Sequence, residues 1–228
     1  VGGSTGAVTV DFAAEFGAAF TDANAADLAG LTSGSISFAD GVLHSAERLQ
    51  QRILDNLRQN AERLGVTFPP GLDVPGQFGE LIRQARVRHG QRAVVLVDEY
   101  DKPILDNITE PDIAREMRDG LRNLYSVIKD EDAHIRFALL TGVSKFSKVS
   151  LFSGLNNLKD ITVDARYSAI CGYTDEDVDT VFAPELPGLD RAQIRTWYNG
   201  YNWTGTSVYN PFDLLLLFQE REFHPYWF

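Results

Sequence analysis

Residues 93–97 read AVVLV, an unbroken apolar run that contains three β-branched valines. A strand without polar alternation is typical of a parallel sheet that is covered on both faces. Amphipathic helical patterns lie on both sides of this run, at 41–64 and 76–89 before it and at about 109–129 after it. This arrangement predicts an α/β fold built around a parallel sheet with flanking helices.

The remaining elements are predicted from shorter signals. IRFALLTG at 135–142 predicts a second buried strand, and VTVDF near the start predicts a strand at about 7–12. Residues 13–40 are rich in Ala, Gly, Ser and Asp and are interpreted mainly as loop. We therefore expect an α/β core over residues 1–150.

After about residue 150 the predicted elements become shorter. Short helices are predicted at 174–182 and 189–200, the second stopped by Gly200, and YNWTGTSVYNPF predicts a turn or hairpin. A last helix is expected to begin at Pro211. Residues 151–228 are therefore expected to form a small, mainly helical region.

Three carboxylates, Asp98, Glu99 and Asp101, follow the AVVLV run directly. In parallel α/β sheets, ligands bind beyond the carboxyl ends of the strands. One carboxylate there can hold Mg²⁺ opposite substrate phosphates, and a second can orient or deprotonate a water molecule. The pattern matches a Walker B strand, with Asp98 as the metal residue and Glu99 as the catalytic residue. The alternative is structural, because carboxylates are also common wherever strand ends meet water.

The second strand ends in TGVSK, which places further polar groups near this edge. Thr141 is a candidate catalytic residue, since a polar group at that position can touch the γ-phosphate or the attacking water, or can serve only as a turn residue. Ser144 and Lys145 are candidate nucleotide-binding residues. Lys102 is interpreted as a surface partner of Asp101 or Asp106, although it can also reach a phosphate.

Several long motifs resemble one family. VVLVDEYDKPILDN, LRNLYSVIKD, IRFALLTGVSKFSKVSLFSGLNNLKDIT, YSAICGYT, WYNGYNW and VYNPFDLL resemble the AAA-ATPase-like family of uncharacterised, largely bacterial proteins. These proteins commonly carry a PD-(D/E)XK-type nuclease-like domain further along the chain. The resemblance is dense over residues 92–228 and weak before them, where VTVDF resembles the family's strand after the P-loop helix.

The resemblance implies a P-loop NTPase-like fold with ATP and Mg²⁺ as cofactors. It implies that Asp98 and Glu99 are the Walker B pair and that Thr141 occupies the sensor position on the adjacent strand. It also implies that the region with the WYNGY motif is lid-like, and that a downstream nuclease-like domain is a partner in the full-length protein.

The sequence departs from the family at the phosphate loop. No G-K-[ST] occurs anywhere in the chain, and the opening GGSTG has neither a lysine nor a preceding strand. Residue 1 is Val, and the sequence stops within HPYWF, so we expect a fragment of a longer protein that is cut after its Walker A loop. The segment alone is expected to bind ATP weakly or not at all and to be inactive as an ATPase.

Charge and composition limit the partners. The formal net charge is −11, which opposes binding to a nucleic-acid backbone. The single cysteine, Cys171, fits a reducing compartment, and no apolar run approaches the ~18–20 residues that span a bilayer. We therefore expect a cytoplasmic segment that binds neither membrane nor nucleic acid directly.

Three functions remain open from the sequence. The first is an ATPase-type module that regulates a partner or a downstream nuclease-like domain. The second is a non-catalytic scaffold or interaction module without a phosphate loop. The third is a nuclease centre at Glu99-Tyr100-Asp101-Lys102, which lacks an identifiable upstream acid and has an unsuitable net charge.

Overall fold

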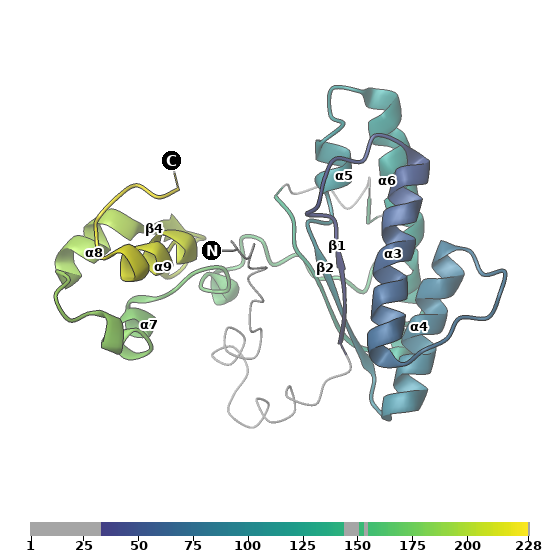
Figure 1. Cartoon of the computed structure of the whole chain (residues 1–228), viewed down its shortest axis with the longest axis horizontal. Helices are drawn as coiled ribbons and strands as arrows, with labels where there is room; N and C mark the ends of the chain where they lie inside the picture. The colour runs from purple at the N-terminus through teal and green to yellow at the C-terminus, as the bar shows by residue number, and fades with distance from the viewer. Residues whose placement is uncertain (1–32, 144–150, 153–154, 228) are drawn as a thin grey trace, which may run out of the picture. The chain divides into compact units, whose positions relative to one another are not determined.

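The computed structural model describes residues 33–143, 151–152 and 155–227. These residues divide into two compact units, one that ends at Leu158 and one that runs from Lys159 onward (Figure 1). The assignment of residues 1–150 to a P-loop-like core and 151–228 to a lid stays a prediction.

The first unit contains a three-stranded parallel sheet in the order β1-β2-β3. The strands are β1 (Ser33–Ser37), β2 (Ala93–Asp98) and β3 (Ile135–Leu140). One face of the sheet is covered by three helices, α3 (Ala46–Leu64), α4 (Val74–His89) and α6 (Pro111–Asp130) (Figure 1). The predicted α/β class with a parallel sheet and flanking helices is confirmed.

The central strand is as deeply buried as its sequence predicts. Val94, Val95 and Val97 are 6%, 4% and 2% exposed. The strand β3 is also where it was predicted, but the prediction that it is buried is wrong for most of its length. Only Ile135 is buried, and Phe137 is 38% exposed. Within the described residues β3 is the last strand in the order, so only β2 lies beside it.

The strand β1 lies in a segment that was interpreted as loop. Its sequence, SGSIS, has a single apolar residue, Ile36, which is paired in register with Val97 and packs into the core. The strand was not predicted, because a single apolar residue among polar neighbours does not show the alternation of apolar and polar positions that indicates a strand. The strand predicted at residues 7–12 lies outside the described residues.

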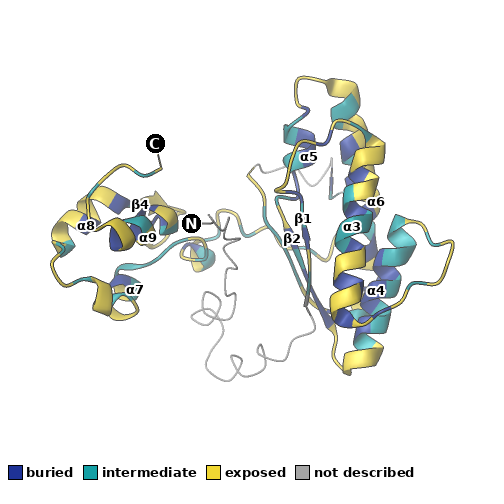
Figure 2. Ribbon diagram, viewed as in Figure 1, coloured by how far each residue is buried: buried dark blue, intermediate teal, exposed yellow. Residues whose placement is uncertain are grey.

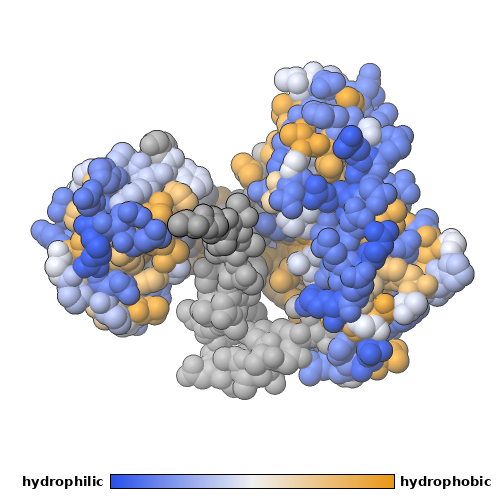
Figure 3. Space-filling view, viewed as in Figure 1, coloured by the Kyte–Doolittle hydropathy of each residue, from blue (hydrophilic) through white to orange (hydrophobic). Residues whose placement is uncertain are grey.

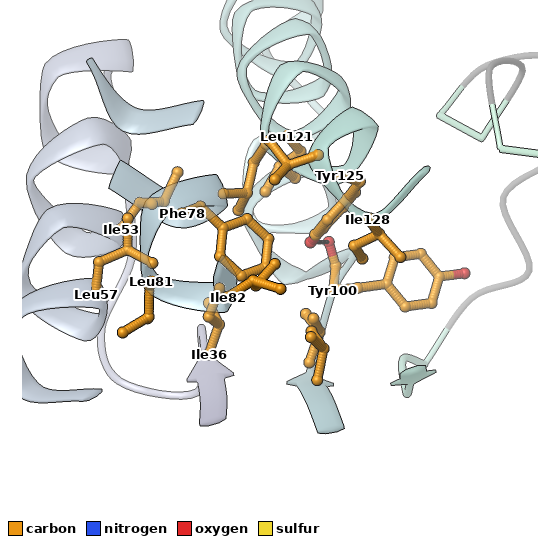
Figure 4. Packing of buried hydrophobic residues seen from close by; sticks show 14 of the residues in the cluster. Ile36, Ile53, Leu57, Phe78, Leu81, Ile82, Tyr100, Leu121, Tyr125 and Ile128 are labelled. Atoms are coloured by element: carbon orange, nitrogen blue, oxygen red, sulfur yellow. Dashed lines mark hydrogen bonds between the residues drawn. The ribbon is translucent and has the colours of Figure 1, made fainter. Parts of the chain in front are cut away.

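The core of this unit lies between the sheet and the three helices. Ile53 and Leu57 of α3 and Phe78 of α4 converge on Ile36 (Figure 4), and each of these four side chains is at most 3% exposed. Burial follows one side of each helix (Figure 2), and the outward side of α3 is hydrophilic (Figure 3). The helices therefore fold as their amphipathic patterns predict.

Capping residues set the helix boundaries. The helix α3 begins five residues later than expected, because the Ser45 side chain accepts a hydrogen bond from the amide of Arg48. It ends at Gly65, whose φ of 67° lies in the left-handed region that glycine adopts without strain. At α6, Glu110 stands at the N-cap and makes no side-chain cap bond, although the preceding residue, Thr109, is of a type that more often caps helices.

Two asparagines of α3 hydrogen-bond to the outer edge of β1. Asn60 accepts from the Ser35 amide at 3.2 Å and donates to the Ser35 carbonyl at 2.7 Å. One turn earlier, Asn56 accepts from the Ser37 amide at 3.2 Å and donates to the Ser37 carbonyl at 3.3 Å. Backbone groups without a partner are costly when buried, so these side chains stabilise β1 where no further strand pairs with it among the described residues.

The second unit is mainly helical, with one hairpin. Its α-helices and strands are α7 (Asp175–Thr180), α8 (Arg191–Tyr198), β4 (Asn199–Asn202), β5 (Ser207–Tyr209) and α9 (Pro211–Glu220). The antiparallel pair β4-β5 confirms the predicted hairpin. The helix α8 ends at Tyr198, before Gly200, because the chain enters β4 at Asn199.

This unit has its own core, formed by Val178, Ile194, Tyr198, Tyr209, Leu214, Leu217 and Phe218. Not all of its aromatic residues are buried: Trp197, Trp203 and Trp227 are 46%, 43% and 57% exposed. Across the part of the chain that the structure describes, no helix combines the length and apolar character needed to cross a bilayer.

Replacing Asn60 with alanine is expected to lower the free energy of unfolding by about 1–3 kcal/mol, because the amide and carbonyl of Ser35 lose their side-chain partners. Urea denaturation measures this change. The matched control is Gln59→Ala, an exposed neighbour on the same helix. A loss no larger than that of the control would contradict the stabilising role of Asn60.

Candidate active site at the carboxyl edge of the sheet

The chain turns sharply where β2 ends. Asp98 is the last residue of the strand and is exposed, and Glu99 follows with a φ of 53°. A left-handed conformation costs a non-glycine residue roughly 1–2 kcal/mol, and such strain tends to occur at functional sites. The turn then leads into the short helix α5 (Lys102–Leu105).

Thr141 lies beside Asp98, at the end of the adjacent strand. The Thr141 hydroxyl donates to Asp98 Oδ1 at 2.8 Å, and the Thr141 amide donates to the Val97 carbonyl at 2.8 Å. The Tyr100 amide in turn donates to the Thr141 carbonyl at 2.9 Å. Thus Asp98, Glu99 and Thr141, three residues chosen from the sequence, lie at one edge of the sheet.

Glu99 has an unusual environment for a carboxylate. Its Oε2 atom is buried and has no hydrogen-bond partner among the residues that the structure describes. Burial raises the pKa of Glu99, and the nearby charge of Asp98 raises it further, while Lys102 opposes the shift. Glu99 therefore binds a proton more tightly than an ordinary glutamate does. No described residue donates a hydrogen bond to its buried Oε2 atom.

The described residues suit a water-rich cation site and not a dense cage. No group of three or more His, Cys, Asp and Glu side chains among them is arranged to hold a metal ion. Mg²⁺ usually keeps several waters and needs only one or two protein carboxylates. The exposed carboxylate of Asp98 fits that requirement.

The other residues singled out from the sequence have different outcomes. Ser144 and Lys145 lie outside the described residues. Lys102 forms an ion pair with Asp106, as the surface interpretation predicted, and its amino group also donates to the Gly41 carbonyl at 3.4 Å.

Two neighbours of the site were not identified from the sequence. Gly142 packs so closely on the turn that an added Cβ would lie 2.5 Å from Asp101 Oδ1. Tyr125 of α6 is fully buried and donates its hydroxyl to the Tyr100 carbonyl at 3.1 Å (Figure 4). A glycine directly after a strand signals close packing, but nothing in the periodicity of α6 distinguishes Tyr125 from its other core residues.

Comparisons with known proteins identify the family of the chain. A family model described as predicted AAA-ATPase matches residues 34–152, which include the sheet, Asp98, Glu99 and Thr141. The chain belongs to this AAA-ATPase-like family. The resemblance stated from the motifs is thereby confirmed, and membership suggests that the protein uses nucleotide and metal.

One relative of this AAA-ATPase-like chain is an uncharacterized protein in the vnfD 5′ region of Azotobacter chroococcum mcd 1. The two are 70% identical over 193 residues, which are 85% of this chain and 37% of that protein. The AAA-ATPase-like chain thus spans little more than a third of the relative's length. No solved structure matches it.

Replacing Glu99 with glutamine is expected to raise the melting temperature at pH 7 by about 2 °C. Folding raises the pKa of Glu99 above its ordinary value of 4.5, so the stability that the native carboxyl group contributes is complete below about 4.5 and is lost as the pH rises through the folded value. The gain from glutamine should therefore shrink toward zero at pH 4.

Thermal denaturation followed by circular dichroism between pH 4 and pH 7 checks this pH dependence. Glu110→Gln, at an exposed position at the start of α6, is the matched control. An equal gain at both ends of the pH range would show that the effect of the Glu99 variant is not electrostatic.

Proposed function

We propose that the first unit is the carboxylate half of an ATP-hydrolysing site in a P-loop NTPase-like core. The observation that carries the proposal is the convergence of Asp98, Glu99 and Thr141 at one sheet edge, with a buried, unpartnered oxygen on Glu99. The phosphate loop would come from residues of the complete protein that lie outside this sequence, since no G-K-[ST] occurs within it.

Each residue has a distinct task in this proposal. Asp98 would hold the cation, and Thr141 fixes the orientation of the Asp98 carboxylate through their 2.8 Å hydrogen bond. Glu99 orients and deprotonates the attacking water, and its raised pKa makes it a stronger base than an ordinary glutamate. If bound, ATP would supply the phosphoryl group, and Mg²⁺ would neutralise the charge that develops on it.

Further parts of the proposal concern the chain around the site. Ser144 and Lys145 come four and five residues after the end of β3 in the sequence, so they are proposed to contact the phosphates. The region from 151 to 228 is proposed to act as a lid. The whole module is proposed to regulate a partner or a nuclease-like domain elsewhere in the protein, in the cytoplasm.

A non-catalytic scaffold is the second candidate function. The observation that favours it is the lack of G-K-[ST] in all 228 residues, because the carboxylates need a phosphate cradle to act on ATP. The two functions differ in whether the complete protein binds ATP, which can be measured directly.

In the complete protein, Glu99→Gln is expected to leave the ATP dissociation constant nearly unchanged and to lower turnover by about 100-fold or more, because glutamine cannot accept the proton. Equilibrium binding of ATP and steady-state phosphate release measure the two quantities. Glu110→Gln again serves as the control.

Unchanged turnover in the Glu99 variant would refute the role of Glu99 as base. A complete wild-type protein that binds no ATP would refute the ATPase proposal and favour the scaffold. ATP binding without turnover in the wild type would limit the proposal to a nucleotide-binding module.

A further inference from the structure

Asp101 is a fully buried carboxylate that the proposed hydrolysis does not use. It stands at the N-cap of α5, yet its side chain makes no cap hydrogen bond with that helix. Instead, Asp101 Oδ1 accepts a hydrogen bond from the amide of Val143 at 3.2 Å. The carboxylate thus reaches across to the segment after β3.

Gly142 makes this contact possible. A Cβ on Gly142 would lie 2.5 Å from Asp101 Oδ1 and 2.6 Å from a ring carbon of Tyr100, distances that real Cβ atoms essentially never show. The backbone after β3 therefore lies directly on the turn after β2, and only a residue without a side chain fits at the point of contact.

The contact at Asp101 continues a series of hydrogen bonds between the ends of the two strands. The Thr141 amide is bonded to Val97, and the Tyr100 amide is bonded to the Thr141 carbonyl. The next hydrogen bond in this series runs from the Val143 amide to Asp101 Oδ1. The turn is also held from α6, because the buried hydroxyl of Tyr125 donates to the Tyr100 carbonyl.

We propose that Asp101 is a positioning residue that fixes the segment Thr141–Val143 on the turn containing Glu99. Its effect on hydrolysis rests on the proposed function above. A hydrogen bond to a buried carboxylate is charge-assisted and is strengthened by the low local dielectric, so the bond from the Val143 amide is well suited to hold backbone in place. Releasing it lets Thr141 move away from Asp98, whose orientation the Thr141 hydroxyl sets.

Two substitutions remove the contact by different means. Asp101→Ala deletes the acceptor, and Gly142→Ala pushes the segment away from it. Asp101→Asn keeps an oxygen acceptor and is the conservative variant. The matched control is Glu131→Ala, which removes another nearly buried carboxylate, 9% exposed and paired with Arg83, from the chain just before β3.

The experiment uses the complete protein and two measurements. Hydrogen–deuterium exchange by mass spectrometry reports on the peptide that contains residues 141–143, and steady-state kinetics give kcat and KM for ATP. Asp101→Ala and Gly142→Ala are expected to speed exchange in that peptide and to lower kcat about 10–100-fold with little change in KM, since small misplacements near reacting groups have effects of this size. Asp101→Asn should retain most of both properties.

Unchanged exchange in Asp101→Ala would overturn the proposal, and so would an equal loss of kcat in Glu131→Ala, since that loss would reflect general destabilisation. If the wild-type protein does not hydrolyse ATP, the proposed function fails, and the exchange measurement alone decides whether Asp101 holds the segment. Normal kcat in Asp101→Ala with active wild type would refute the positioning role and leave the proposed function standing.

Discussion

Parallel pairing of β2 with both of its neighbours is the constraint on which the rest of the first unit depends. The hydrogen bonds of β1 and β3 to β2 fix all three strands in the same direction, so their carboxyl ends lie at one edge. The segments that leave β2 and β3 must therefore meet there. The helices pack on the sheet in this register, which makes Ile36, Val97 and their neighbours face the same way.

The three carboxylates at this edge are treated in three different ways by their surroundings. Asp98 is exposed and accepts a hydroxyl hydrogen bond, and Asp101 is buried and accepts a backbone amide. Of the three, only Glu99 has a buried oxygen to which no group in the described part of the chain donates, and its backbone conformation is itself strained. Similar groups with divergent environments are the usual means by which a site assigns different chemical tasks to them.

Sequence patterns predicted the helices and the central strand, which have strong signals of their own. They did not predict features that depend on a contact between distant segments. The valine run and the amphipathic helices predicted the fold class and the place of Asp98, Glu99 and Thr141. The strand β1 was missed, because its pairing with β2 and the side chains of α3 stabilise a polar segment with little strand character of its own. Likewise, the burial of Asp101 depends on Gly142, some forty residues away in the chain.

The two asparagines on α3 also affect whether a further strand can pair with β1. An exposed strand edge is a template for pairing with any other strand, whether from the same protein or from another molecule. At β1 the outward groups of Ser35 and Ser37 are already bonded to Asn60 and Asn56, so an incoming strand would have to displace four hydrogen bonds before it formed any. Among the described residues β1 is therefore the last strand on its side of the sheet, and these bonds oppose edge-to-edge aggregation at that edge.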